Sequence, residues 1–278
     1  MAEFREKLPI VVRGVVNWPI RHPAFCLAGI LLLSFTAKLV AMKLEPAIGR
    51  DSCLYLYMAQ IWEETGSYEG LLREIPKIDR IPSLLPFLIK SMGVAGIPAE
   101  TAGLAVNILL GGLIPLVGFG IAFEATEDKK IALMAALLLA VHPKLTDLAT
   151  EIQRDAPYLF FSGCAVWFTL TGLRRQKLTA WCGAGIALGF ALLLRYETME
   201  FLLLLSAAAP VCAMVHLISW KKAVLYSSSL LVCTAVIFYV LILLMGTQAI
   251  ISSYTDYTNL TINNAGKTIF GLPKSAEE

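Results

Sequence analysis

Long apolar runs alternate with short polar segments along most of the chain. A hydrocarbon core about 30 Å thick is crossed by a helix of about 20 mainly apolar residues, so these runs predict membrane-spanning helices. The pattern predicts spans at residues 24–42, 101–123, 131–141, 156–173 and 181–194, followed by two that end near residues 218 and 244. We therefore expect an all-α protein, a polytopic transmembrane bundle with about seven spans.

The composition favours a membrane protein over a soluble one. Hydrophobic residues make up 57% of the chain and charged residues only 16%, whereas an ordinary soluble domain has about 45–50% apolar and about 25% charged residues. The net charge of +2 and the lack of a basic stripe interleaved with aromatic residues exclude a nucleic-acid surface. The six cysteines show no CxxC spacing, so neither a zinc site nor a disulfide framework is expected.

Lysine and arginine residues gather on one side of the predicted bundle. They occur before residue 24 and in the short turns at residues 129–130, 174–177 and 221–222. The positive-inside rule makes this side cytoplasmic. We expect a multi-pass protein of a bacterial plasma (inner) membrane, with a transmembrane module at residues 1–245 and an outward-facing tail at residues 246–278.

The long loop at residues 44–99 is the largest segment outside the predicted spans, and it faces periplasm or cell exterior. Its segment RDSCLYLYMAQIWEETG places Leu54, Met58 and Ile61 on one helical face and Asp51 with Tyr55 on another. This pattern predicts an amphipathic helix on the membrane surface. The apolar segment at residues 81–92 is too short to cross a bilayer and is expected to form a second interfacial helix.

Small residues recur inside two of the predicted spans. Gly185 and Gly189 form a GxxxG motif in the fifth span, and Gly111 and Gly112 are adjacent in the second. Glycines at such positions let two helix backbones approach closely, so we assign them to packing.

Acidic and basic residues are paired at four places on the predicted outward face. The pairs are Arg50 with Asp51, Asp79 with Arg80, Arg154 with Asp155, and Arg195 with Glu197. One interpretation is structural, with aspartates that cap helices and arginines that anchor them at the headgroups. The other is a shared cavity, in which carboxylates act as a general base or metal ligands and arginines hold an anion such as a phosphate.

Four segments resemble the membrane glycosyltransferases of the GT-C fold, in the branch of protein mannosyltransferases and lipid A aminoarabinose transferases. RDSCLYLYMAQIWEETG is similar to the acidic motif that follows that family's first helix, and KIDRIPSLLPFLIK to its acidic-Lys-Pro-Pro-Leu segment. HPKLTDLATEIQRDAPYLFF is similar to its second outer loop, and GIALGFALLLRYETMEFLLL to its glycine-rich helix with a basic end.

The resemblance implies a conserved module of membrane helices with two surface helices in the first outer loop. It implies an inverting enzyme that moves a sugar from a polyprenyl-phosphate donor to a lipid, glycan or protein acceptor. Asp51 would then be the catalytic base and Asp155 its partner, while Asp79 matches an acidic position that would hold a divalent metal ion, the candidate cofactor. Basic residues would hold the donor phosphate, namely Arg80, Arg195, Arg50 and Arg154.

Two other functions fit the same pattern. A transporter or flippase of a lipid-linked substrate would also place arginines near lipid headgroups, although transporters usually carry charges near the membrane midplane on broken helices. A non-catalytic homologue, or a module that acts with a partner subunit, is the other alternative.

Overall fold

The structure is a computed structural model, and it describes residues 21–44, 48–74 and 84–245. These residues form helices and contain no strand. The helices are α3 (Pro23–Leu44), α4 (Arg50–Thr65), α5 (Tyr68–Glu74), α6 (Leu84–Gly93), α7 (Ala99–Thr126), α8 (Lys129–Ala140), α9 (Pro143–Thr150), α10 (Asp155–Arg175), α11 (Leu178–Leu192), α12 (Thr198–Met214) and α13 (Trp220–Met245). The all-α prediction is therefore confirmed for the described part of the chain.

Each apolar run that the sequence singled out forms a helix, namely α3, α7, α8, α10, α11, α12 and α13. By length and composition, four described helices can cross a membrane, and these are α3, α7, α10 and α13. The count rises to five if α8 and α9, which meet at an angle of 53°, form one bent span. Helices α11 and α12 are apolar but shorter. A multi-pass bundle is thus supported, while the expected count of about seven spans is higher than helix length alone supports.

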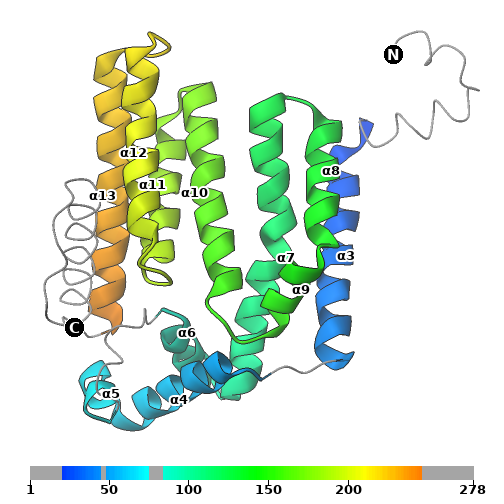
Figure 1. The fold of residues 1–278 in the computed structure, drawn as a ribbon. Coiled ribbons are helices and arrows are strands. Elements are labelled where there is room, and N and C mark those ends of the chain that lie inside the picture. The colour runs from blue at the N-terminus through cyan, green and yellow to red at the C-terminus, as the bar shows by residue number, and fades with distance from the viewer. Residues whose placement is uncertain (1–20, 45–47, 75–83, 246–278) are drawn as a thin grey trace, which may run out of the picture.

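The long helices lie side by side, and each packs against its spatial neighbours from one edge of the molecule to the other (Figure 1). Helices α3 and α8 occupy one edge, α7 and α10 the middle, and α11, α12 and α13 the other edge. Helices α4, α5, α6 and α9 gather at one end, together with the start of α10 and the turn after α11. We call this the α4 end. The turns after α7, α10 and α12 lie at the opposite end.

Close helix contacts are made at the glycines that the sequence assigned to packing. A Cβ atom at Gly185 of α11 would lie 2.4 Å from the carbonyl oxygen of Leu230 in α13, and one at Gly189 would lie 2.8 Å from Ile237 Cβ. The hydroxyl of Thr234 in α13 also donates a hydrogen bond to the Gly185 carbonyl, at 3.1 Å. The packing role of the GxxxG motif is therefore confirmed.

Helix α4 ends where the sequence predicted, because Gly66 adopts a left-handed conformation with φ of 69° and its N–H bonds to the Trp62 carbonyl. Its buried face is different from the prediction. Tyr55 is buried together with Met58 and Trp62, in a core that also includes α6 residues such as Leu85. The prediction that placed Tyr55 on a separate face from Met58 is wrong, because the bundle and α6 cover a broader stripe of α4 than a membrane surface would.

An ion cluster joins α7 to α10 at the opposite end. The carboxylate of Glu124, whose side chain is 3% exposed, pairs with both Arg174 and Arg175. Arg174 also lies 3.0 Å from Glu127 and packs over the ring of Phe123. Two of the basic residues that the sequence placed in a cytoplasmic turn are therefore neutralised by acids of α7 and its C-cap.

Candidate functional site

The guanidinium of Arg195 and the carboxylate of Asp155 form an ion pair at the α4 end. Asp155 is the first residue of α10, and Arg195 follows the last turn of α11, so the pair joins two helix ends that are 40 residues apart in sequence. Arg195 also packs over the ring of Tyr158, 5.3 Å from its centroid, and lies 3.9 Å from Glu197. The structure therefore brings together two of the four charged pairs, Arg154–Asp155 and Arg195–Glu197.

Tyr55 brings α4 into the same group of charges. Its side chain is 4% exposed, and burial raises the pKa of its hydroxyl. The charges of Arg154, Asp51, Asp155 and Arg195 also act on this hydroxyl, with the aspartates raising the pKa and the arginines lowering it. Tyr55 therefore stays protonated at neutral pH and is placed among residues from three separate segments.

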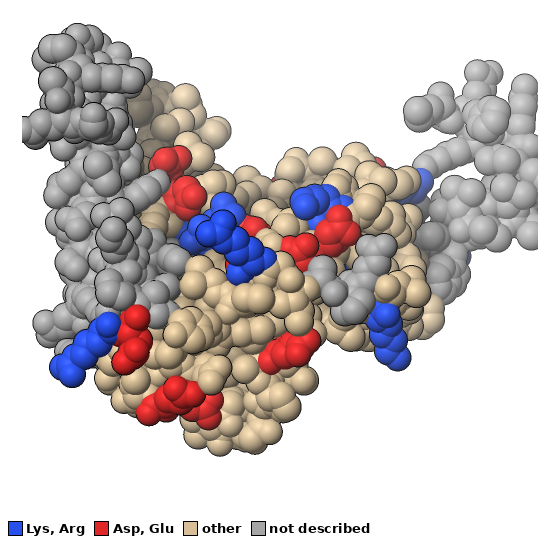
Figure 2. Space-filling model, turned by 60° about the horizontal axis from the view of Figure 1, so that its bottom comes forward, with Lys and Arg blue, Asp and Glu red and all other residues tan. Residues whose placement is uncertain are grey.

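The start of α6 is fixed against the same region. The backbone N–H of Leu84 donates a hydrogen bond of 3.1 Å to the carbonyl oxygen of Leu193, two residues before Arg195. Leu84, Leu193 and Tyr55 also belong to one buried core. The first residue of α6 is thus held beside the turn that carries Arg195. At the α4 end, basic and acidic side chains lie next to one another near the middle of the face (Figure 2).

Asp51 differs from Asp155 in its surroundings. It is exposed in the first turn of α4, and it makes no hydrogen bond or ion pair with any residue that the structure describes. Neither aspartate is the N-cap, because the N-cap residues are Gly49 for α4 and Arg154 for α10, and neither makes a side-chain cap bond. The capping interpretation is therefore wrong for both aspartates.

Two more predicted arginines are present at this end. Arg50 is exposed at the first position of α4, and Arg154 is half-buried just before α10. Neither forms an ion pair within the described part of the chain. Asp79 and Arg80 lie outside the described residues.

A metal site is not formed by the described residues. No three His, Cys, Asp or Glu side chains among them come close enough to hold a metal ion. Asp79, which the resemblance connects with a metal, is not among them. The described residues therefore do not fit a metal centre, and we derive no step of the chemistry from one.

The sequence analysis missed one charged residue inside a predicted span. Lys38 of α3 is fully buried and donates a hydrogen bond of 2.9 Å to the Ser34 hydroxyl, one turn earlier. A charged group within an apolar run is costly and usually lies against protein. Lys38 interrupts the apolar pattern of this span, and this exception is the signal in the sequence that could have identified it. Phe35, three residues earlier, packs on Gly112 of α7.

The chain matches a known family over most of its bundle. The model of the dolichyl-phosphate-mannose-protein mannosyltransferase family covers residues 82–247. The chain belongs to this family. It is therefore a multi-pass membrane protein of a GT-C type glycosyltransferase family, which confirms the resemblance seen in the sequence.

The family match places the site residues in two groups. Arg154, Asp155 and Arg195 lie inside the matched region, whereas Arg50, Asp51, Asp79 and Arg80 precede it. A comparison with curated proteins found no match. Roles for Arg50 and Asp51 therefore depend on the arrangement at the α4 end, and those for Asp79 and Arg80 depend on the sequence resemblance alone.

Proposed function

We propose that this protein transfers a sugar from a polyprenyl-phosphate donor to a lipid, glycan or protein acceptor at the outer face of a bacterial inner membrane. The observation that carries the proposal is the Arg195–Asp155 ion pair at the α4 end, where Arg154 and Asp51 are the other charges that act on the hydroxyl of the buried Tyr55. In this proposal α3, α7, α8, α10, α11, α12 and α13 all cross the membrane, and the α4 end faces outward.

The proposed base is Asp51, because its carboxylate is exposed and unpaired within the described residues. An acceptor hydroxyl attacks the anomeric carbon of the sugar and gives its proton to Asp51. The new carbon–oxygen bond forms as the bond between the anomeric carbon and the donor phosphate breaks. A single displacement of this kind inverts the anomeric centre.

The proposed phosphate ligands are the arginines, and Arg195 has the strongest geometric support. Its Nε atom is buried and has no hydrogen-bond partner among the described residues. A guanidinium has five N–H donors in a fixed plane, which suits the paired oxygens of a phosphate. Arg195 would bind the donor phosphate and stabilise the negative charge that the departing carrier acquires. Arg154 and Arg50 would add positive charge, and Arg80 is proposed for the same role.

Asp155 is proposed to act through Arg195. Its carboxylate holds the guanidinium by an ion pair while Tyr158 supports the guanidinium plane from one side. An arginine held on two sides loses less conformational freedom when a phosphate binds. Asp155 is therefore a positioning residue for the donor, and it is not free in the described structure to accept a proton as Asp51 is.

A transfer assay with the purified full-length protein tests the proposal. The protein is incubated with radiolabelled polyprenyl-phosphate sugars, and with membrane lipids, glycans and peptides as acceptors. We expect transfer of label from at least one donor, with release of polyprenyl phosphate. Parallel reactions with EDTA and with added divalent ions test the proposed metal at Asp79.

A complete lack of transfer would contradict the proposal if donor binding is also absent. Donor binding without transfer, which is restored by adding solubilised membrane proteins, would identify a module that needs a partner subunit. Movement of the donor across a vesicle membrane without sugar transfer would instead favour a flippase.

A further inference from the structure

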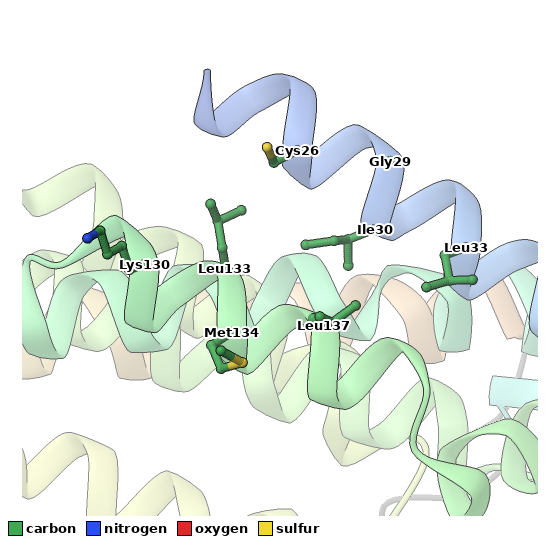
Figure 3. Close-up of a pocket in the computed structure, with 8 residues that line it drawn as sticks. All are labelled: Cys26, Gly29, Ile30, Leu33, Lys130, Leu133, Met134 and Leu137. Atoms are coloured by element: carbon green, nitrogen blue, oxygen red, sulfur yellow. The ribbon is translucent and has the colours of Figure 1, made fainter. Parts of the chain in front are cut away.

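An apolar groove of about 450 Å³ runs between α3 and α8 (Figure 3). It lies on the half of the molecule away from the α4 end, since it begins near the first turns of both helices. Cys26, Gly29 and Leu33 line it from α3, while Lys130, Leu133 and Leu137 line it from α8. Lys130 is the one charged residue among the residues that line it.

No described side chain fills the groove beside Gly29. A Cβ atom built at Gly29 would have no atom within 4 Å. Helix α3 also buries few of its residues, namely Ser34 and Lys38. The groove is therefore open toward the surroundings of the bundle, which are lipid in a membrane protein.

The groove covers about two-thirds of the depth of one bilayer leaflet. Lys130 and Leu137 are two helical turns apart, about 10 Å at 1.5 Å per residue. Half of the hydrocarbon core is about 15 Å thick. The groove thus extends from the end of the bundle toward its middle over a length that holds the greater part of one acyl chain.

The open end of the groove is positively charged. The Lys130 ammonium lies at this end, away from the apolar residues Ile30 and Leu33 (Figure 3). The exposed side chains of Lys129 and Arg21 belong to the same end of α8 and α3. Of the nearby acids, Glu127 pairs with Arg174, and Asp128 caps α8 by accepting a hydrogen bond from the Lys130 backbone N–H, so Arg21, Lys129 and Lys130 outnumber the one unpaired acid among the described residues at this end. This end suits a phosphate group.

We propose that the groove binds one anionic diacyl phospholipid, with an acyl chain between α3 and α8 and its phosphate at Lys130. Arg21 and Lys129 add to the attraction at the headgroup level. The lipid would cover the side of α3 at Gly29, which no described side chain covers. The proposal does not depend on the proposed sugar transfer, because the groove and the charges at the α4 end are on opposite halves of the bundle.

Native mass spectrometry of the full chain tests this proposal. The detergent-purified protein is titrated with dioleoylphosphatidylglycerol or with dioleoylphosphatidylcholine. We expect tighter binding of one phosphatidylglycerol. Lys130→Gln is expected to weaken this binding about fivefold, the effect of one lysine at an anionic surface, and to leave phosphatidylcholine unaffected. Lys221→Gln, which removes an exposed lysine from the start of α13, is the control and should have no effect.

A pair of substitutions at Gly29 tests the acyl-chain part. Gly29→Phe places a ring in the open groove and should abolish binding, while Gly29→Ala leaves the groove open and should keep it. The Cβ atom that either change adds meets open space, so the fold should persist, which circular dichroism checks. In the wild type, phosphatidylglycerol should slow maleimide labelling of Cys26 relative to Cys212 of α12.

Three results would overturn the proposal. Equal affinity for the two phospholipids would exclude recognition of the anionic headgroup. Wild-type binding by Gly29→Phe would place the lipid elsewhere. A polyprenyl phosphate that protects Cys26 at lower concentration than phosphatidylglycerol would identify the carrier as the occupant.

Discussion

Asp51 and Asp155 stand beside arginines in the same sequence pattern, but the fold gives them different surroundings. Asp155 is engaged by Arg195, whereas Asp51 is exposed and has no partner within the described residues. The ion pair occupies the carboxylate of Asp155, whereas the carboxylate of Asp51 is open to a substrate hydroxyl. This difference in geometry is why we give the two aspartates different roles.

Replacement of Asp51 by asparagine is expected to abolish transfer and leave donor binding intact. The amide keeps the shape of the side chain but cannot accept a proton, and a positioned base typically contributes about 10²–10⁴-fold in rate. Turnover and donor affinity are measured separately. Asp147→Asn, at an exposed carboxylate of α9 on the same end, is the control and should keep activity. Near wild-type turnover in Asp51→Asn would remove Asp51 from the mechanism.

Replacement of Arg195 by alanine is expected to weaken donor binding. A hydrogen bond to a charged group contributes about 1.5–3 kcal/mol, which corresponds to about 10–100-fold in the dissociation constant. Arg195→Lys should recover part of the loss, because it restores the charge without the planar set of donors. Lys144→Ala, at an exposed lysine of α9, serves as the control. Unchanged donor affinity in Arg195→Ala would show that the ion pair with Asp155 is only structural.

The sequence indicated the arginines and aspartates but not the role of Tyr55. Charged residues inside an apolar chain are rare and easily noticed, and those at the α4 end come from segments that all follow or precede predicted spans. The burial of Tyr55 depends on how α6 packs on α4, and the Leu84–Leu193 hydrogen bond holds α6 beside the turn after α11. Contacts between distant segments of this kind are not encoded in the periodicity of one helix.

At the scale of helices, the sequence predicted the existence and approximate bounds of the apolar helices, whereas the short helices α5 and α9 were not predicted. Long apolar runs form helices because lipid offers no hydrogen-bond partner to backbone N–H and C=O groups, which must therefore bond to one another. The sequence did not predict which helix faces are covered by protein and which by lipid. The α4 segment has the pattern of a surface helix, yet Met58 and Trp62 are covered by protein. An apolar face is the same in sequence whether lipid or another helix covers it.

The contact between α11 and α13 is expected to be sensitive to small additions at Gly185. In Gly185→Ala the new methyl group would lie 2.4 Å from the Leu230 carbonyl oxygen and 3.1 Å from the Thr234 nitrogen, both backbone atoms. Overpacking of this kind typically costs about 1–3 kcal/mol. Thermal unfolding in detergent should therefore occur at lower temperature.

Gly29→Ala is the matched control for this substitution. Its added methyl group meets nothing within 4 Å, and alanine is favoured over glycine in a helix by about 1 kcal/mol. Gly29→Ala should unfold at or above the wild-type temperature. If Gly185→Ala also does so, the helices can separate without cost and the GxxxG contact is not a packing determinant.

For the whole molecule, the two ends of the bundle differ in charge. The turns at the opposite end carry mostly basic residues, namely Lys129, Lys130, Arg174, Arg175, Lys177, Lys221 and Lys222. The α4 end carries the aspartates and glutamates of α4, α9 and the turns before α10 and α12 as well as its arginines. This asymmetry is visible in the sequence. The convergence of α4, α6, α10 and α11 at one end required the folded arrangement.

Cysteine labelling on intact cells is expected to show the α4 end outside and the opposite end inside. Native Cys53 is exposed on α4, so an impermeant maleimide should label it directly. Lys177→Cys, made in a Cys53→Ser background, should be labelled only after the membrane is permeabilised. Lys177 is chosen in place of Arg175. Arg175 pairs with Glu124, so replacing Arg175 would disturb the contact between α7 and α10.

The basis for this expectation is that short basic turns stay on the cytoplasmic side during insertion. The pairing of Arg174 and Arg175 with Glu124 does not weaken the argument, because acidic residues contribute little to orientation. Labelling of Lys177→Cys but not of Cys53 in intact cells would reverse the topology. The site with Arg195 and Asp155 would then face the cytoplasm, and transfer at the outer face would be wrong. Membership in the glycosyltransferase family and the geometry of the site would still stand, since neither depends on orientation.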